Sequence, residues 1–297
     1  MIEELERVRK KAKNKILTFI FGILFLTMIL FVTFAPLSFF IIVFGTIITF
    51  LATKKDVKAF KDMYKNEIVL SSFNKVCTNV NFDLDKGISC SVIAGTGMMY
   101  MGDRYSSNDY ITGQYKNINF EMSDVHIEEE YTDSDGDTHY VTIFRGQWYI
   151  FDFNKSFKAN IQVCEKTFRN AKRKRLFVKE EEKFKKVELE DINFNKLFKT
   201  YAQNELDAFY VLTPNTMERI KKVNNRVKGH LLLCFIDNRL HIGLYNNKDL
   251  FEVSVFKKVD LEKATKKTMD EISIITNFVD ILSLDNDLFK MQEGGVI

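Results

Sequence analysis

The strongest pattern in this chain is one long apolar stretch near its start. Residues 16–53 contain no charged side chain, and a single helix of that length would extend about 57 Å at about 1.5 Å per residue. The hydrocarbon core of a membrane is only about 30 Å thick, so the stretch must fold back on itself. Pro36 supplies the break, because proline lacks a backbone N–H and clashes with the preceding helical turn. The pattern predicts two membrane helices, Ile16–Phe34 and Leu37–Ala52, that form a hairpin.

The apolar stretch has two other interpretations. A cleaved signal peptide fits less well, because the stretch is too long and no small-residue cleavage pattern is present. A re-entrant hairpin, which enters the membrane without crossing it, stays open because the turn at Pro36 is short. In either case the lipid bilayer is the expected partner of residues 16–52, and both flanks emerge on the same side.

Beyond the apolar stretch, the spacing of Val57, Phe60 and Tyr64 predicts a helix over Asp56–Val76. The stretch that follows, through Gly97, has no regular pattern.

From Ile118 onward apolar and polar residues alternate, which is typical of a half-buried strand. The alternation shifts by one after Met122 and resumes at Val125, which indicates a β-bulge. The acidic segment Tyr131–Thr138 is predicted to turn the chain into a second strand that reaches Trp148. Further strands are expected at Ala159–Cys164, Lys186–Glu190, Lys199–Ala202, His230–Ile236, Leu240–Leu244 and Phe251–Val255.

Two helices are predicted among these strands. Thr213 is a good N-cap, and Pro214 suits the first helical position. The segment Val259–Leu282 carries an apolar stripe at helical spacing, which predicts a long helix that covers the sheet. The expected fold class is α+β: an N-terminal transmembrane helical hairpin, then a mainly antiparallel β-sheet domain with packed helices, including the long C-terminal one. The expected domains are a basic N-terminus with the anchor (1–53), a juxtamembrane helix (54–78), a soluble domain (79–290) and a tail (291–297).

The distribution of charge predicts how the hairpin is oriented in the membrane. Residues 1–15 hold six Lys or Arg against three Glu, and residues 53–65 hold five Lys against two Asp. No charged residue lies in the turn of the hairpin. The positive-inside rule predicts that the N-terminus and the main domain face the cytoplasm, from a multi-pass position in a bacterial inner membrane. Each flank has a surplus of three positive charges, so the rest of a chain with a net charge of +3 sums to −3. Nucleic-acid binding is not expected of this acidic remainder.

The sequence contains no recognisable metal or cofactor motif. The cysteines Cys77, Cys90, Cys164 and Cys234 form no CxxC pair and are expected to be free thiols, although two long-range disulfides stay open. The acidic turn that begins at Asp133 lacks the glycine and glutamate of a calcium-binding EF-hand loop. Of the four histidines, His126 and His139 are placed to face each other across the predicted hairpin. We expect no cofactor.

Candidate site residues are few, and each has a structural alternative. Asp103, Arg104 and Asp109 form the densest polar group beside aromatic residues, suited to a phosphate or acyl ligand or to a loop held by a salt bridge. Asn154 and Lys155 could meet an anionic ligand or form a tight turn. A basic run could hold the domain against anionic lipid or be a solvated loop; it comprises Arg169, Lys172, Arg173, Lys174 and Arg175.

The order of segments resembles a known family. The resemblance rests on four motifs: DRYSSNDYITGQY (Asp103–Tyr115), FRGQWYIFDFNKSF (Phe144–Phe157), VELEDINFNKLFKTY (Val187–Tyr201) and DAFYVLTP (Asp207–Pro214). By these motifs the chain resembles the uncharacterised bacterial membrane-protein family known as domain of unknown function 3137, over nearly its whole length. The resemblance implies the architecture above and carries no assigned activity. It also implies a membrane-protein partner, because genes of the family often neighbour those of other membrane proteins.

The leading hypothesis is a membrane-anchored cytoplasmic domain that binds a protein partner or lipid head groups, without catalysis. The alternative is an enzyme that acts on a phosphorylated or membrane-derived substrate at Asp103, Arg104 and Asp109. A transporter or channel subunit is disfavoured, because neither span carries an ionisable residue.

Overall fold

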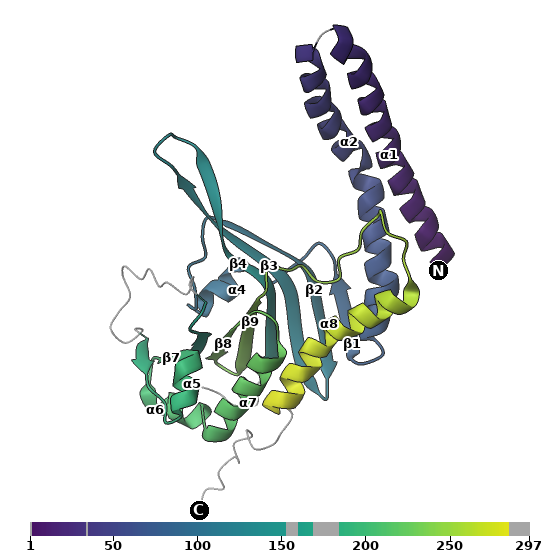
Figure 1. Cartoon of the computed structure of the whole chain (residues 1–297). Coiled ribbons are helices and arrows are strands. Elements are labelled where there is room, and N and C mark those ends of the chain that lie inside the picture. Colours follow the sequence, from purple (N-terminus) through teal and green to yellow (C-terminus); the bar gives the residue numbers. More distant parts are fainter. Residues whose placement is uncertain (1, 34, 153–159, 169–183, 285–297) are drawn as a thin grey trace, which may run out of the picture. The chain divides into compact units, whose positions relative to one another are not determined.

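The computed structural model describes residues 2–33, 35–152, 160–168 and 184–284. They belong to two compact units (Figure 1). The first comprises Met1–Phe73 and Phe251–Met269, and the second comprises Asn74–Leu250 and Asp270–Ile297.

The first unit contains the predicted helical hairpin. Helix α1 spans Ile2–Thr33 and helix α2 spans Ala35–Tyr64, so the apolar stretch is divided as predicted. Pro36 lies in the first turn of α2, where a missing N–H breaks no helical hydrogen bond. Both helices are long and apolar enough to cross a membrane.

The predicted helix after the second span is not a separate element. Helix α2 continues past the apolar stretch to Tyr64, a π-helical turn η1 follows over Lys65–Val69, and α3 spans Leu70–Phe73. The segment predicted as Asp56–Val76 is therefore helical to Phe73 and continues the second apolar helix.

The polar base of the hairpin folds against a segment from the far end of the chain. Lys15 Nζ lies 2.7 Å from Asp56 Oδ2, which joins α1 to α2. Arg9 Nη1 donates to the carbonyl of Val255 at 2.8 Å. The strand predicted at Phe251–Val255 is therefore wrong: Phe251 has a left-handed backbone (φ +58°), and no ladder forms there. An alternation over five residues cannot distinguish a strand from an extended segment that packs on a helix.

The second unit is built on one antiparallel sheet. Nine strands of the described residues lie in the order β1-β2-β3-β4-β9-β8-β5-β7-β6. Their bounds are β1 Thr78–Asp83, β2 Arg104–Tyr115, β3 Ile118–Thr132, β4 Thr138–Asp152, β5 Ile161–Glu165, β6 Lys185–Val187, β7 Phe198–Ala202, β8 His230–Ile236 and β9 Arg239–Tyr245. The predicted α+β class and the β3–β4 hairpin are confirmed, whereas β1 lies in the stretch that we predicted to be irregular and β2 was not predicted. The predicted bulge has its extra residues on β2, between Asn108 and Ile111, rather than on β3.

Short helices complete this unit. They are α4 Cys90–Gly95, α5 Ile192–Leu197, α6 Glu205–Val211 and α7 Pro214–Arg226. The longer helix α8 spans Leu261–Leu282, and its residues from Asp270 onward belong to this unit. Helix α7 begins as predicted, with Thr213 Oγ1 accepting from the N–H of Thr216 at 3.3 Å. The predicted long C-terminal helix is confirmed as α8. Helices α5 and α6 were missed because each has fewer than two full periods of an apolar stripe.

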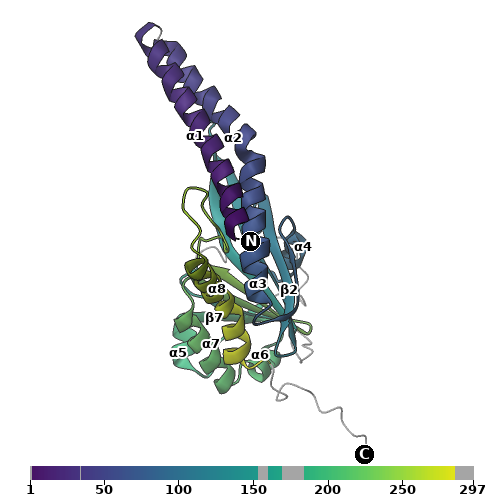
Figure 2. The same cartoon turned by 90° about the vertical axis from the view of Figure 1, so that its right-hand side faces the viewer.

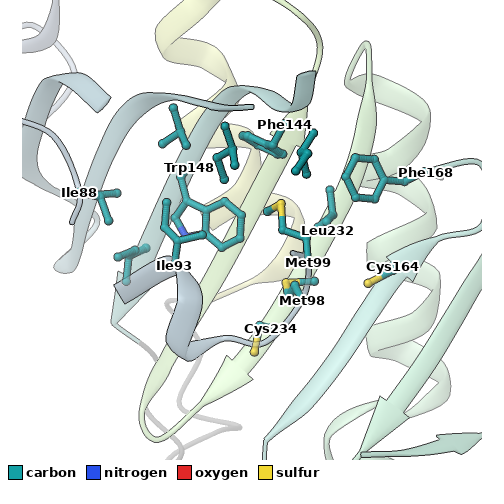
Figure 3. Packing of buried hydrophobic residues seen from close by; sticks show 14 residues of the cluster. Ile88, Ile93, Met98, Met99, Phe144, Trp148, Cys164, Phe168, Leu232 and Cys234 are labelled. Carbon is teal, nitrogen blue, oxygen red and sulfur yellow. The ribbon is translucent and has the colours of Figure 1, made fainter. Parts of the chain in front are cut away.

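Both faces of the sheet are covered, because successive side chains of a strand point to opposite sides. Tyr149 and Phe151 pack against Phe278 of α8, with ring centroids 5.2 and 6.0 Å apart. Trp148 points the other way, into a cluster that includes Ile93 of α4 (Figure 3). Figure 2 views the sheet between these layers.

Candidate functional site

The end of the β3–β4 hairpin projects past the sheet of the second unit (Figure 1). We call residues 128–142 the acidic ribbon. The last pair that β2 makes with β3 joins Arg104 to Glu128, and the last pair that β9 makes with β4 joins Tyr245 to Gly146. Beyond these pairs the two strands of the ribbon are joined to each other by a register that runs to the pair Thr132–Thr138.

Asp103 and Arg104, two of the predicted site residues, support the base of the acidic ribbon. The N–H of Asp103 donates to the carbonyl of Glu128 at 2.9 Å. Its carboxylate accepts from the N–H of Glu130, also at 2.9 Å. The Arg104 guanidinium lies 4.5 Å from the centre of the Tyr140 ring, a cation–π distance. These two residues therefore position a hairpin, through backbone hydrogen bonds and a cation–π contact.

The turn of the acidic ribbon is closed by its first aspartate. Asp133 Oδ1 accepts from the N–H groups of Asp135 and Asp137 at 3.0 and 2.9 Å. His139 Nε2 lies 2.6 Å from Asp133 Oδ2, and this hydrogen bond, with the backbone donors, lowers the pKa of Asp133. Gly136 has a left-handed backbone at φ +88°. The segment is thus the predicted polar turn. Among the described residues, no group of three His, Cys, Asp or Glu side chains could hold a metal ion.

Asp109, the third residue of the predicted group, lies elsewhere on the same strand. Five residues separate it from Arg104, about 16 Å along an extended strand. It sits in the bulge of β2, is buried, and has a left-handed backbone at φ +57°. Asn108 Nδ2 donates to its carboxylate at 3.0 Å. The structure therefore brings Asp103 and Arg104 together and places Asp109 apart from them.

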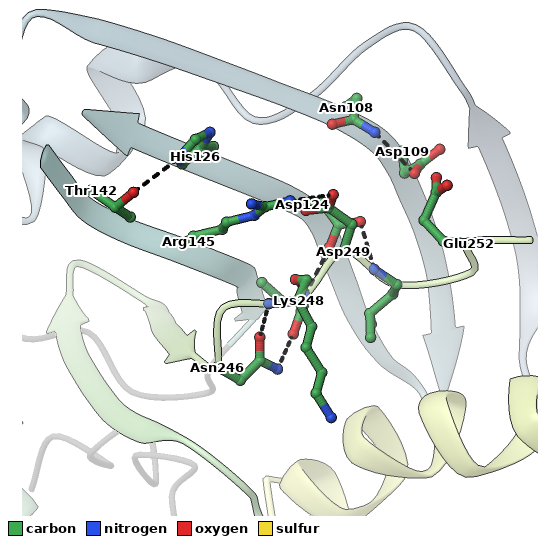
Figure 4. Close-up of polar contacts among 12 residues, drawn as sticks. Asn108, Asp109, Asp124, His126, Thr142, Arg145, Asn246, Lys248, Asp249 and Glu252 are labelled. Carbon is green, nitrogen blue, oxygen red and sulfur yellow. Dashed lines mark hydrogen bonds and ion pairs between the residues drawn. The ribbon is translucent and has the colours of Figure 1, made fainter. Parts of the chain in front are cut away.

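Asp109 instead belongs with a buried polar network that sequence reasoning missed (Figure 4). Asp124 on β3 accepts from Gln147 Nε2 and from the N–H of Leu250, each at 2.9 Å. Gln147 also donates to the carbonyl of Lys248 at 2.7 Å. Burial raises the pKa of Asp124 well above its usual value, and the nearby Asp109 carboxylate raises it further.

This network ties the segment that follows β9 to the middle of the sheet. The sequence contained one usable signal, since Asp124 falls at the phase shift between Met122 and Val125, where a strand has both faces covered. A buried carboxylate that already accepts hydrogen bonds is better suited to holding the segment after β9 in place than to reacting with a substrate.

A polar hollow of about 350 Å³ lies on the sheet between β1 and β9. Tyr110 Oη donates to Glu121 at 2.6 Å, and Arg239 Nη1 lies 3.3 Å from the same carboxylate. Across the hollow Asn119 donates to Asp152 at 2.7 Å. Burial and the Glu121 carboxylate raise the pKa of Tyr110 to about 12, so its hydroxyl stays protonated at neutral pH. These side chains hydrogen-bond one another, an arrangement that stabilises the outer face of the strands.

The remaining predicted site residues cannot be placed. Asn154 and Lys155 lie outside the described residues. So does the basic run, Arg169, Lys172, Arg173, Lys174 and Arg175.

The histidines and cysteines are dispersed. In the β3–β4 ladder His126 pairs with Arg145, and His139 pairs with Tyr131. The predicted His126–His139 pair is therefore wrong, because the last pair before the turn, Thr132–Thr138, leaves His139 next to the tip of the hairpin. His241 is buried and accepts from Trp148 Nε1 at 3.3 Å. Burial lowers the pKa of His241 to about 4, so the ring is neutral at physiological pH. All four cysteines are free thiols, as expected.

Comparison with known proteins adds a family. Residues 142–284 match the family model described as "Protein of unknown function (DUF3137)". No curated protein matches the chain. Among solved structures, the chain is similar to the crystal structure of the mycobacterial trehalose monomycolate transport factor A, TtfA, at 6% identity and a TM-score of 0.39. That similarity covers 75% of this chain and 96% of the other.

The family match runs from the outer end of β4 through α8, and so includes the second half of the sheet, α7 and the long C-terminal helix. It covers three of the four motifs on which the sequence resemblance rests. The part of the chain that this match covers is therefore similar to the DUF3137 family of proteins of unknown function.

Proposed function

We propose that this chain is a membrane-anchored binding module, held in a bacterial inner membrane by the α1–α2 hairpin, with its sheet unit in the cytoplasm. The observation that carries the proposal is the exposure of large apolar side chains along the outer parts of α1 and α2. Phe25 exposes 68% of its surface, Met28 75% and Phe50 65%. A contiguous apolar surface of this extent is rare on soluble monomers. Lipid is the solvent that would cover it.

The distribution of charge supports the orientation. The basic residues of the hairpin lie at its base, where Lys11 and Lys15 lie 3.4 and 2.7 Å from Asp56. The carboxylate of Asp56 has a lowered pKa, chiefly because Lys15 donates a hydrogen bond to it. A base that is charged and a tip without charge fit a hairpin whose two ends stay on the positively flanked side.

Binding, rather than catalysis, is the role that the described residues favour. The predicted polar group Asp103, Arg104 and Asp109 is divided between the base of a ribbon and a buried network. A domain fixed at a membrane surface and carrying a projecting ribbon suits the capture of a protein partner.

Topology tests this proposal directly. A cysteine placed at Ser134 lies in the exposed turn of the acidic ribbon. Only Cys90 needs replacement by serine as background, because the other three cysteines are buried, and burial raises the pKa of Cys77 to about 11. We expect a membrane-impermeant maleimide to label S134C/C90S after lysis and to leave intact cells unlabelled, with C90S alone as the matched control.

Labelling of intact cells would place the sheet unit outside the cytoplasm and overturn the orientation. The anchor itself is tested by washing membranes with alkaline carbonate. An integral hairpin stays in the pellet, whereas release of the chain into the supernatant would contradict a membrane anchor.

A further inference from the structure

The acidic ribbon extends beyond the strands that flank β3 and β4 in the sheet. In a sheet most strands have a neighbour on both sides, whereas residues 138–141 of β4 have β3 as their one strand neighbour among the described residues. An isolated two-stranded hairpin is marginally stable in water. This one is nevertheless braced at its base by Asp103 and closed at its tip by Asp133.

The brace is built into the backbone as well. Gly102 precedes Asp103 with a left-handed backbone at φ +61°, and a Cβ at that position would lie 2.2 Å from the carbonyl of Glu128. At the other end Tyr131 stacks on His139, with ring centroids 5.2 Å apart and planes 26° apart. The ribbon is therefore held in one shape before any partner arrives, which lowers the entropic cost of binding.

Apolar surface is exposed on this ribbon. Tyr131, Tyr140 and Val141 each expose nearly half of their surface, at 48, 46 and 48%. Tyr140 and Val141 lie on the part of β4 that has no second strand neighbour in the described structure. Natural edge strands are usually protected by lysine, proline or a covering element, and residues 138–141 contain neither lysine nor proline. An extended segment of another protein can add to such an edge by main-chain hydrogen bonds.

The charge of the ribbon selects the kind of segment. Residues 128–142 hold six carboxylates and no lysine or arginine, in a chain whose net charge is +3. The carboxylates are those of Glu128, Glu129, Glu130, Asp133, Asp135 and Asp137. This charge repels anionic lipid and nucleic acid and attracts a basic polypeptide, for which it also accelerates association.

We propose that the acidic ribbon docks an extended, Lys- or Arg-rich segment of a partner protein along residues 138–141 of β4. The inference rests on the proposed function as a binding module and names the chemistry of its partner. Main-chain pairing with β4 supplies affinity, Tyr140 and Val141 supply apolar contact, and the carboxylates of Glu130, Asp135 and Asp137 select basic side chains.

The test uses the full chain in nanodiscs of zwitterionic lipid and a fluorescent peptide of about ten residues in which Lys alternates with Val. The triple variant Glu130→Gln, Asp135→Asn, Asp137→Asn removes three exposed carboxylates and leaves Asp133, which holds the turn, unchanged. We expect it to weaken peptide binding about tenfold. The matched control Glu188→Gln, Glu190→Gln, Glu205→Gln removes three exposed carboxylates elsewhere on the second unit and should change the Kd less than about twofold.

A second peptide separates strand addition from simple charge attraction. Proline in place of the two central valines keeps the charge and removes two backbone donors, so we expect its binding to be at least about tenfold weaker. A photo-crosslinking residue in the first peptide should label residues 138–141. Equal loss in the two triple variants, equal binding of the two peptides, or labelling elsewhere would overturn the proposal. Retention of the chain in carbonate-washed membranes is scored separately, so loss of the ribbon proposal and loss of the anchor are distinguishable.

Discussion

Phenylalanine is used in opposite ways by the apolar part of the helical hairpin and by the sheet unit. In the hairpin Phe21, Phe25 and Phe31 expose 66, 68 and 67% of their surface. In the sheet unit Phe144, Phe151 and Phe278 expose none. The difference lies in what each backbone needs. A helix satisfies its own N–H and C=O groups and can offer every side chain to lipid, whereas a sheet must cover both faces with other parts of the protein.

The comparison also explains where polar groups can be buried. The apolar part of the hairpin contains no ionisable residue. The sheet unit buries Asp124, Gln147 and His241, each with a hydrogen-bond partner. Strand pairing and a covering loop bring donors and acceptors from distant residues to these groups, whereas the backbone groups of two helices are already satisfied within each helix.

The largest expected effect comes from replacing a buried phenylalanine of the sheet unit, and replacing an exposed phenylalanine of the hairpin is its control. Phe278→Ala removes a ring that packs on Tyr149 and Phe151, and should destabilise the sheet unit by about 3–5 kcal/mol. Phe25→Ala in the hairpin should change that stability by less than about 0.5 kcal/mol. Urea unfolding in detergent, followed by the fluorescence of Trp148, the sole tryptophan, measures both. Similar shifts for the two variants would erase the distinction between the units.

A glycine of the sheet should show how closely its core is packed. Gly243 lies opposite Trp148 in the β4–β9 ladder, and a Cβ there would sit 2.7 Å from the indole ring. Gly243→Ala should therefore cost about 1–3 kcal/mol through overpacking and shift the Trp148 emission.

Gly95 provides the control for that substitution. It ends α4, and a Cβ there would have no neighbour within 4 Å. Gly95→Ala should leave stability unchanged or raise it slightly. If Gly243→Ala did not lower the stability, the packing around Trp148 would be looser than the structure shows.

The smallest effect concerns pH. His241 has a pKa of about 4 in the folded state because it is buried, whereas an unfolded histidine titrates near about 6.5. Below about pH 6.5 the histidine binds a proton in the unfolded chain, whereas His241 in the folded chain stays neutral down to about pH 4. The stability contributed by neutral His241 is complete above about pH 6.5 and declines as pH falls toward 4. Between pH 7.5 and 5.5 the contribution of His241 to the free energy of unfolding should fall by about 1.3 kcal/mol.

The pH dependence can be assigned by substitution. His241→Gln keeps an acceptor near Trp148 Nε1 and removes the titrating group. The pH slope of the urea midpoint should flatten in this variant between pH 7.5 and 5.5, whatever its absolute stability. An unchanged slope would mean that another group is responsible.

The prediction of the hairpin succeeded because its signal is local. An uncharged stretch too long for one span, broken by Pro36, allows little besides two helices. The N-cap at Thr213, the turn at Asp133 and the stripe of α8 are likewise determined by residues within one or two turns of each other. The strands β8 and β9 were recognised because their apolar runs are nearly continuous.

What the sequence could not supply is pairing across long separations. Strand β2 was not predicted because a bulge interrupts its alternation, and its partners become visible only in the sheet. Asp109 is close in sequence to Asp103 and Arg104, yet the bulge turns it into a buried network with Asp124 while they brace the ribbon. Sequence alone therefore determined the helical hairpin, the helix N-cap at Thr213 and the polar turn at Asp133. Tertiary structure decided which polar residues meet, because strand register and burial depend on contacts that no local pattern encodes.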